Sequence, residues 1–106
     1  MSEKEVVAAV RAAGLPVAHM AWPKDSAPKL PFCVFYIYED ATVFADDSRY
    51  AEHYRWCVEL YQSQLDSESE KKLEAELKSA FGTFEKSEAW VESEGCMQTT
   101  YVFDQY

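Results

Sequence analysis

The chain has 106 residues, of which 48% are hydrophobic and 27% charged, and nineteen acidic residues against ten basic ones give a formal net charge of −9. This length suits one domain with one core over residues 1–106, and the apolar content excludes intrinsic disorder. The excess of carboxylates argues against specific binding to nucleic-acid phosphates, because that binding depends on Lys and Arg.

Membrane insertion and disulfide bonding are also disfavoured. No run of eighteen or more apolar residues suggests a membrane span, and the N-terminal Met-Ser-Glu-Lys-Glu lacks the features of a secretory signal. We therefore expect a protein that starts in a cytoplasm and has no membrane partner. Cys33, Cys57 and Cys96 are odd in number and stand in apolar runs, so we interpret them as buried thiols.

A first helix is predicted over residues 3–13. Ser2 and Glu5 have the spacing of a capping box, and apolar residues follow at helical spacing until Gly14. Residues 15–31 contain all four prolines. We expect an extended loop there.

Three strands are expected next, at residues 32–38, 42–45 and 50–62. The first consists of aromatic, β-branched and other apolar residues on both of its faces. Both faces of that strand should therefore be covered. The third alternates between apolar and polar residues, which is typical of a half-buried antiparallel strand.

The C-terminal third predicts a helix and a hairpin. Ser67 and Glu70 repeat the capping-box spacing, and the apolar stripe that follows ends at Gly82. Residues 84–94 and 96–103 then have the composition of two strands joined by a turn. We expect them to close the sheet.

Together these elements predict an α+β fold, with an antiparallel sheet of about five strands and two helices on one face, in the order α-β-β-β-α-β-β. Two short helices can cover one face of such a sheet. Because the strand at residues 32–38 is apolar on both faces, we expect a neighbouring chain to cover the remainder.

No group of residues points to catalysis or to a bound metal. His53 stands near Asp46, Asp47 and Glu52, but no second histidine lies at ligand spacing. Three glycines are too few for a phosphate-binding loop, and no Gly-x-Ser-x-Gly motif occurs. We therefore expect a protein that is not an enzyme and needs no cofactor or metal.

Several segments of the sequence resemble those of one protein family. They are LPFCVFY at residues 30–36, the Asp46-Asp47 turn before Tyr50, YRWCVELY at 54–61, FEKSEAWVESE at 84–94 and QTTYVF at 98–103. Together they resemble the tail-completion and tail-terminator proteins of long-tailed, siphovirus-type phages and prophages. The resemblance covers about residues 15–104.

The resemblance implies a structural virion protein without catalytic residues. Its copies would form a homo-oligomeric ring, often a hexamer, that terminates the tail tube and joins it to the neck. The implied partners are further copies of the chain, the tail-tube protein and the neck or connector proteins, and assembly would take place in the host cytoplasm. An acidic inner wall would let the genome pass without holding it.

The family's contacts vary in sequence, so the candidate interface residues come from this chain alone. A first set forms the predicted hairpin tip that is best able to reach a neighbour: Thr42, Val43, Phe44, Asp46 and Asp47. A second set shares one face of the strand at residues 32–38 and would be covered by a neighbour, unless Phe35 points at the helices instead: Cys33, Phe35 and Ile37.

An alternative function is that of an acidic inhibitor that mimics DNA and occupies a nucleic-acid-binding protein. Such a mimic needs carboxylates spaced like phosphates along one surface. In this chain the acids are dispersed among predicted turns, helix caps and strand edges. The sequence therefore favours the ring subunit.

Overall fold

The structure is a computed structural model, and it describes residues 3–22, 28–40, 43–44, 50–51, 54–65 and 67–105. Its elements in chain order are α1 (Glu3–Ala12), β1 (Val17–His19), β2 (Phe32–Asp40), β3 (Val43–Phe44), β4 (Tyr50–Ala51), β5 (Tyr54–Gln62), α2 (Glu68–Phe81), β6 (Glu85–Val91) and β7 (Cys96–Gln105).

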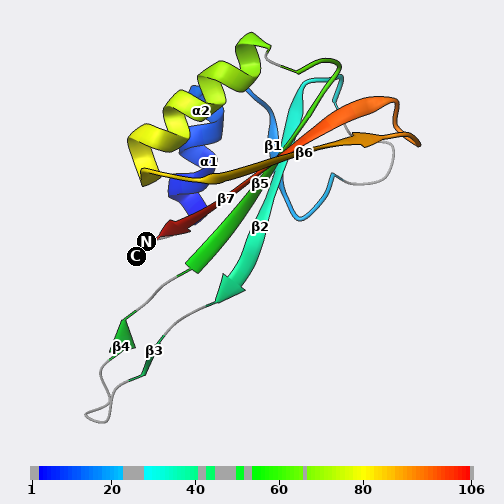
Figure 1. The fold of residues 1–106 in the computed structure, drawn as a ribbon. Helices are drawn as coiled ribbons and strands as arrows, with labels where there is room; N and C mark the ends of the chain where they lie inside the picture. The colour runs from blue at the N-terminus through cyan, green and yellow to red at the C-terminus, as the bar shows by residue number, and fades with distance from the viewer. Residues whose placement is uncertain are drawn as a thin grey trace.

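Five strands form one sheet in the order β1-β2-β5-β7-β6, and both helices lie on the same side of it (Figure 1). The α+β class, the order of the predicted elements and the placement of the helices are confirmed. All neighbouring strands are antiparallel except β1 and β2, which are parallel. The sheet is thus mixed, because β1 arises within the proline-containing segment that was predicted to be a loop.

The core lies between the helices and one face of the sheet. Trp56, Val58 and Leu60 alternate along β5 and belong to this core, which confirms the predicted alternation. Two aromatic rings close the core near the C-terminal end of α2, where Phe81 stacks on Phe103 with ring centroids 4.5 Å apart.

Helix α2 begins and ends as its sequence predicts. The Ser67 hydroxyl accepts a hydrogen bond of 3.1 Å from the backbone N–H of Glu70. At the other end Gly82 has a φ of 85° and donates its N–H to the carbonyl of Lys78. This left-handed conformation suits glycine because it has no Cβ.

Strands β3 and β4 pair only with each other and form a two-stranded ribbon. The strand predicted at residues 42–45 is therefore outside the main sheet, and the strand predicted at 50–62 is divided between β4 and β5. Figure 1 shows the ribbon beyond the ends of β2 and β5, away from the helices. No helix in the described part of the chain is long and apolar enough to cross a membrane.

Candidate interaction surfaces

The described residues hold no group of three or more His, Cys, Asp and Glu side chains placed to bind a metal ion. The three cysteines are free and buried. Burial raises the pKa of the Cys33 thiol to about 12. Burial likewise raises the pKa of Cys57 to about 11, although its hydrogen bond with Tyr36 acts in the opposite direction. Such thiols stay protonated at neutral pH and are poor nucleophiles.

An open groove of about 680 Å³ lies on the sheet face opposite the helices. One wall comes from the segment before β2, and the other from the turn between β6 and β7. The floor comes from β2, β5 and β7. Its principal apolar lining residues are Met20, Trp22, Leu30, Phe32, Val34 and Tyr61.

Aromatic side chains that line the groove pack against one another. Phe32 stacks on Tyr61 with ring centroids 5.2 Å apart. Trp22 meets Phe32 edge to face at 6.1 Å. The indole Nε1 of Trp22 is buried and has no hydrogen-bond partner among the described residues. A buried donor without an acceptor is costly, so a molecule that enters the groove with a carbonyl or carboxylate would relieve that cost.

A hydrogen-bond network continues across the same sheet face. The Glu59 carboxylate accepts hydrogen bonds of 2.9 Å from the hydroxyls of Tyr36 and Tyr61, and Gln98 donates to the Tyr61 oxygen at 3.0 Å. Burial, followed by the bond to Glu59, raises the pKa of Tyr61 to about 12. The bond with Cys57, burial and the bond with Glu59 together raise the pKa of Tyr36. These polar groups satisfy one another within the chain and keep the groove floor in a fixed geometry.

Exposed apolar side chains mark the outer edge of β2. Strand β1 covers this edge only as far as Phe35, and a β-bulge follows between Ile37 and Glu39. The exposed fractions of Met20, Ile37 and Tyr38 are 65%, 45% and 58%. Met20 also has a φ of 69°, a conformation that non-glycine residues seldom adopt. Large apolar groups beside an unpaired strand edge are typical of protein contacts.

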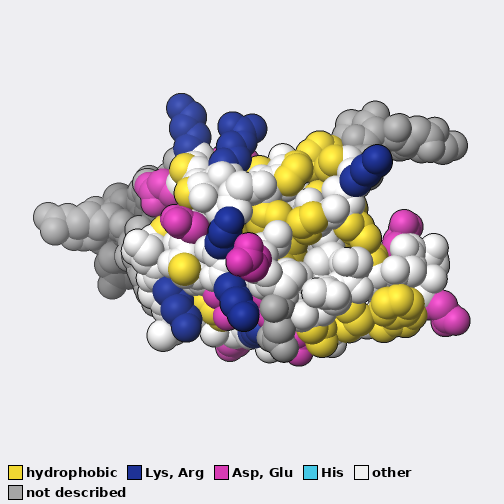
Figure 2. All heavy atoms as spheres, turned by 90° about the horizontal axis from the view of Figure 1, so that it is seen from above, with side chains coloured by type: hydrophobic (Ala, Val, Ile, Leu, Met, Phe, Trp, Pro, Cys, Tyr) yellow, Lys and Arg dark blue, Asp and Glu magenta, His cyan; other side chains and the backbone are white. Residues whose placement is uncertain are grey.

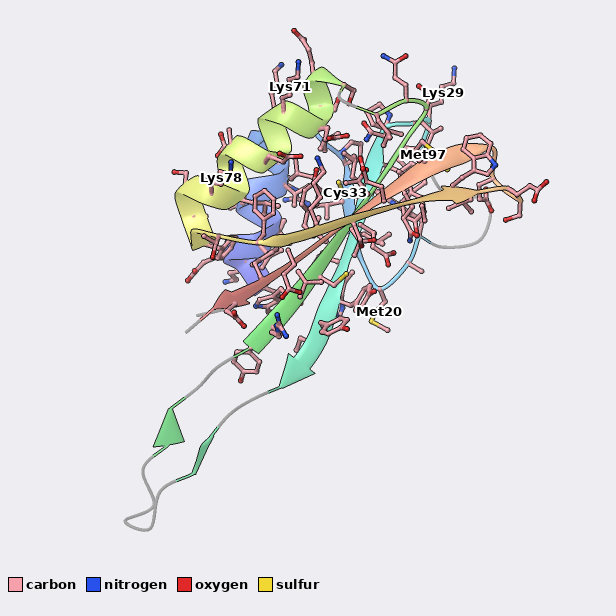
Figure 3. The ribbon with its side chains drawn as sticks, viewed as in Figure 1. Met20, Lys29, Cys33, Lys71, Lys78 and Met97 are labelled. Atoms are coloured by element: carbon pink, nitrogen blue, oxygen red, sulfur yellow. The ribbon has the colours of Figure 1, made fainter. Side chains whose placement is uncertain are left out.

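Charged side chains are distributed unevenly over the surface. Lys and Arg side chains stand mainly over the two helices, and hydrophobic ones gather toward the β6–β7 turn (Figure 2). Lys71 projects outward from α2, whereas Met20 and Lys29 lie at the loops beside β2 (Figure 3). The helix face is thus a solvated surface, and the groove and the edge of β2 are the apolar ones.

The fold has a solved counterpart. A chain from the virion of a native gene transfer agent (GTA) particle superposes with a TM-score of 0.64 at 12% sequence identity, over 95% of this chain and 87% of that chain. No protein-family model and no curated protein matches the sequence. At this identity the comparison establishes a shared fold.

The candidate interface residues fall in different places. Cys33 and Phe35 lie in the core, with exposed fractions of 0% and 2%, so the chain's own helices cover that face and no neighbour can reach it without displacing them. Ile37 is exposed because it lies past the covered part of the strand. Val43 and Phe44 form β3, where the backbone alone is described. Thr42, Asp46 and Asp47 lie outside the described residues, as does His53.

The opposite face of β2 carries Phe32, Val34 and Tyr36 and contributes Phe32 and Val34 to the groove, where Val34 is only 6% exposed. Sequence reasoning recognised that both faces are apolar, took the face of Cys33, Phe35 and Ile37 as a candidate for a neighbour, and left open that Phe35 points at the helices, as it does here. The available signal was Glu59, which pairs with Val34 in the register and marks the half-polar face of β5.

Proposed function

We propose that this protein is a structural subunit of a phage-type virion, and that its copies form a ring that terminates the tail tube and joins it to the neck. The observation that carries the proposal is the fold shared with a chain of a GTA virion over 95% of this sequence. The phage tail-terminator resemblance of residues 15–104 supports the same class independently of the fold.

The surfaces of the molecule support a role in assembly. The exposed side chains of Met20, Ile37 and Tyr38 lie near the part of the β2 edge that no other described strand covers, and the groove is apolar and open. Among the described residues, neither surface holds a set of titratable groups suited to acid–base or nucleophilic catalysis. The alternative of a DNA mimic is less well supported, because several carboxylates serve internal contacts: Glu70 and Glu74 bind Lys86, and Glu59 accepts from two tyrosines.

Native mass measurements test this proposal. The purified protein, alone and mixed with the tail-tube subunit of its own particle, should form a ring or join the end of the tube. Deleting its gene should leave heads and tails unjoined or tails of uncontrolled length. A protein that stays monomeric beside every virion component would refute the proposal.

A further inference from the structure

We propose that the β3–β4 ribbon of one copy docks in the groove of a second copy, so that successive copies join head to tail. This inference rests on the ring function proposed above and gives it a specific contact. It assigns the donor surface to residues 43–44 and 50–51 and the acceptor surface to the groove on the open face of the sheet.

In the described part of the chain, the ribbon is a sheet separate from the five-stranded one. Its paired positions are Val43 opposite Ala51 and Phe44 opposite Tyr50, which are all apolar or aromatic residues. Beyond that pairing, β3 and β4 make no extensive contact with another described helix or strand. An isolated two-stranded hairpin is marginally stable in water, so packing against a second molecule would stabilise it.

The groove offers the apolar packing surface that this ribbon lacks. Its floor and walls are largely apolar, and its volume of about 680 Å³ is in the range that holds several side chains. The buried Nε1 of Trp22, which has no hydrogen-bond partner among the described residues, lies at its side. A ribbon supplies backbone carbonyls along its edges, and one of these would accept that hydrogen bond.

The ribbon cannot enter the groove of its own chain. Phe32 pairs with Tyr61 at the groove end of the sheet, and Asp40 pairs with Tyr54 at the ribbon end. The nine residues of β2 separate these ends by about 30 Å. The occupant is therefore another copy. A contact between two different surfaces of the same chain repeats from copy to copy and closes into a ring when the rotation permits.

Charge also favours a contact between ribbon and groove over one between two ribbons. The connection between β2 and β5, with its flanks, carries five acids and one arginine: Glu39, Asp40, Asp46, Asp47, Glu52 and Arg49. Two such segments side by side would repel each other. The groove is less acidic than this segment, because Lys29 lines it together with Glu59 and Glu94.

Three single variants test the contact. Phe44→Ser removes the largest apolar group of β3, and Leu30→Glu puts a charge on the groove wall at a residue that is 37% exposed. Ala75→Glu, on the exposed side of α2, is the matched control. Self-association is measured by analytical ultracentrifugation, with the tube subunit present if the wild type needs it. Phe44→Ser and Leu30→Glu should each weaken assembly at least tenfold, whereas the control assembles like the wild type.

Circular dichroism separates loss of assembly from loss of folding. The monomers of both variants should keep the wild-type thermal midpoint within a few degrees. If Leu30→Glu lowers the midpoint further, Ala21→Glu replaces it, because Ala21 also lines the groove and is exposed.

Mixing the two variants gives the decisive result. The intact groove of the Phe44→Ser chain can accept the intact ribbon of the Leu30→Glu chain, so an equimolar mixture should yield 1:1 dimers that grow no further. Absence of these dimers, or normal assembly by either variant alone, would overturn the ribbon contact and leave the ring function standing. A wild type that assembles neither with itself nor on the tube would instead overturn the ring function.

Discussion

Lys86 Nζ lies 2.7 Å from Glu70 Oε2, and this ion pair fastens the edge strand β6 to helix α2. The Glu70 side chain is 2% exposed and also accepts a hydrogen bond of 2.6 Å from Gln62 Nε2. Lys86 contacts Glu74 at 2.7 Å as well. One lysine therefore compensates a buried carboxylate and holds the outermost strand against the helix layer.

Replacing Lys86 by Met should lower the free energy of unfolding by about 2 to 3 kcal/mol. Breaking a fully buried pair costs about 3 to 5 kcal/mol, and the partial exposure of Lys86 reduces that cost. Urea denaturation followed by circular dichroism measures the change. Lys71→Met, on the exposed side of α2, is the control and should stay within about 0.5 kcal/mol of the wild type. Equal losses in the two variants would contradict the buried role of Glu70.

Leu77→Ala should destabilise the protein by about 2 to 5 kcal/mol, the usual cost of emptying a core site. Leu77 has an exposed fraction of 0% and lies in the core with Leu73. Chemical denaturation gives the value, with the exposed Lys72→Ala on the same helix as a reference. A loss below about 0.5 kcal/mol would show that α2 does not pack through this side chain.

Two glutamate substitutions on β2 should have opposite effects on folding. Phe35→Glu places an unpaired charge in the core at a site that is 2% exposed, so the monomer should unfold. Ile37→Glu changes a residue that is 45% exposed, and the monomer should keep a thermal midpoint close to that of the wild type. Thermal melts of both variants check this. Similar midpoints for the two variants would contradict the placement of Phe35 inside the core and of Ile37 beyond its edge.

Stability should decline as the pH rises from about 9 to 12. Burial raises the folded-state pKa of Cys33 from an ordinary 9.0 to about 12. Above pH 9 the unfolded chain loses this proton while the folded chain keeps it, so the free energy of unfolding falls as the pH rises. Below pH 9 the thiol is protonated in both states, and its contribution to stability is fully present. Tyr61, with a pKa raised to about 12, acts in the same direction above pH 10.

Cys33→Ala isolates the thiol's share of this alkaline decline. The slope of unfolding free energy against pH between 9 and 12 should become shallower by about 1.4 kcal/mol per pH unit, the value for one proton. Denaturant titrations at several pH values give both slopes. Parallel curves for the variant and the wild type would mean that the Cys33 thiol ionises as readily in the folded chain as in the unfolded one.

The sequence by itself determined the helices, most of the strands and the fold class, because these depend on local signals. Ser67 caps α2 through a partner three residues away, and the alternation of Trp56, Val58 and Leu60 follows from the geometry of a single strand. The tip residues Thr42, Asp46 and Asp47 remain a prediction.

Only the tertiary structure decided which face of β2 the helices cover. Phe32 to Ile37 is apolar on both faces, so the hydrophobic pattern of this strand alone gives two equivalent solutions. The long-range pairing of β2 with β5, and of β5 with β7, selects the one that buries Cys33 and Phe35. The same pairing created β1, whose three residues form a strand only because β2 lies beside them. The groove could not be predicted for the same reason: its walls come from segments about seventy residues apart, and no local signal brings Trp22 and Glu94 together.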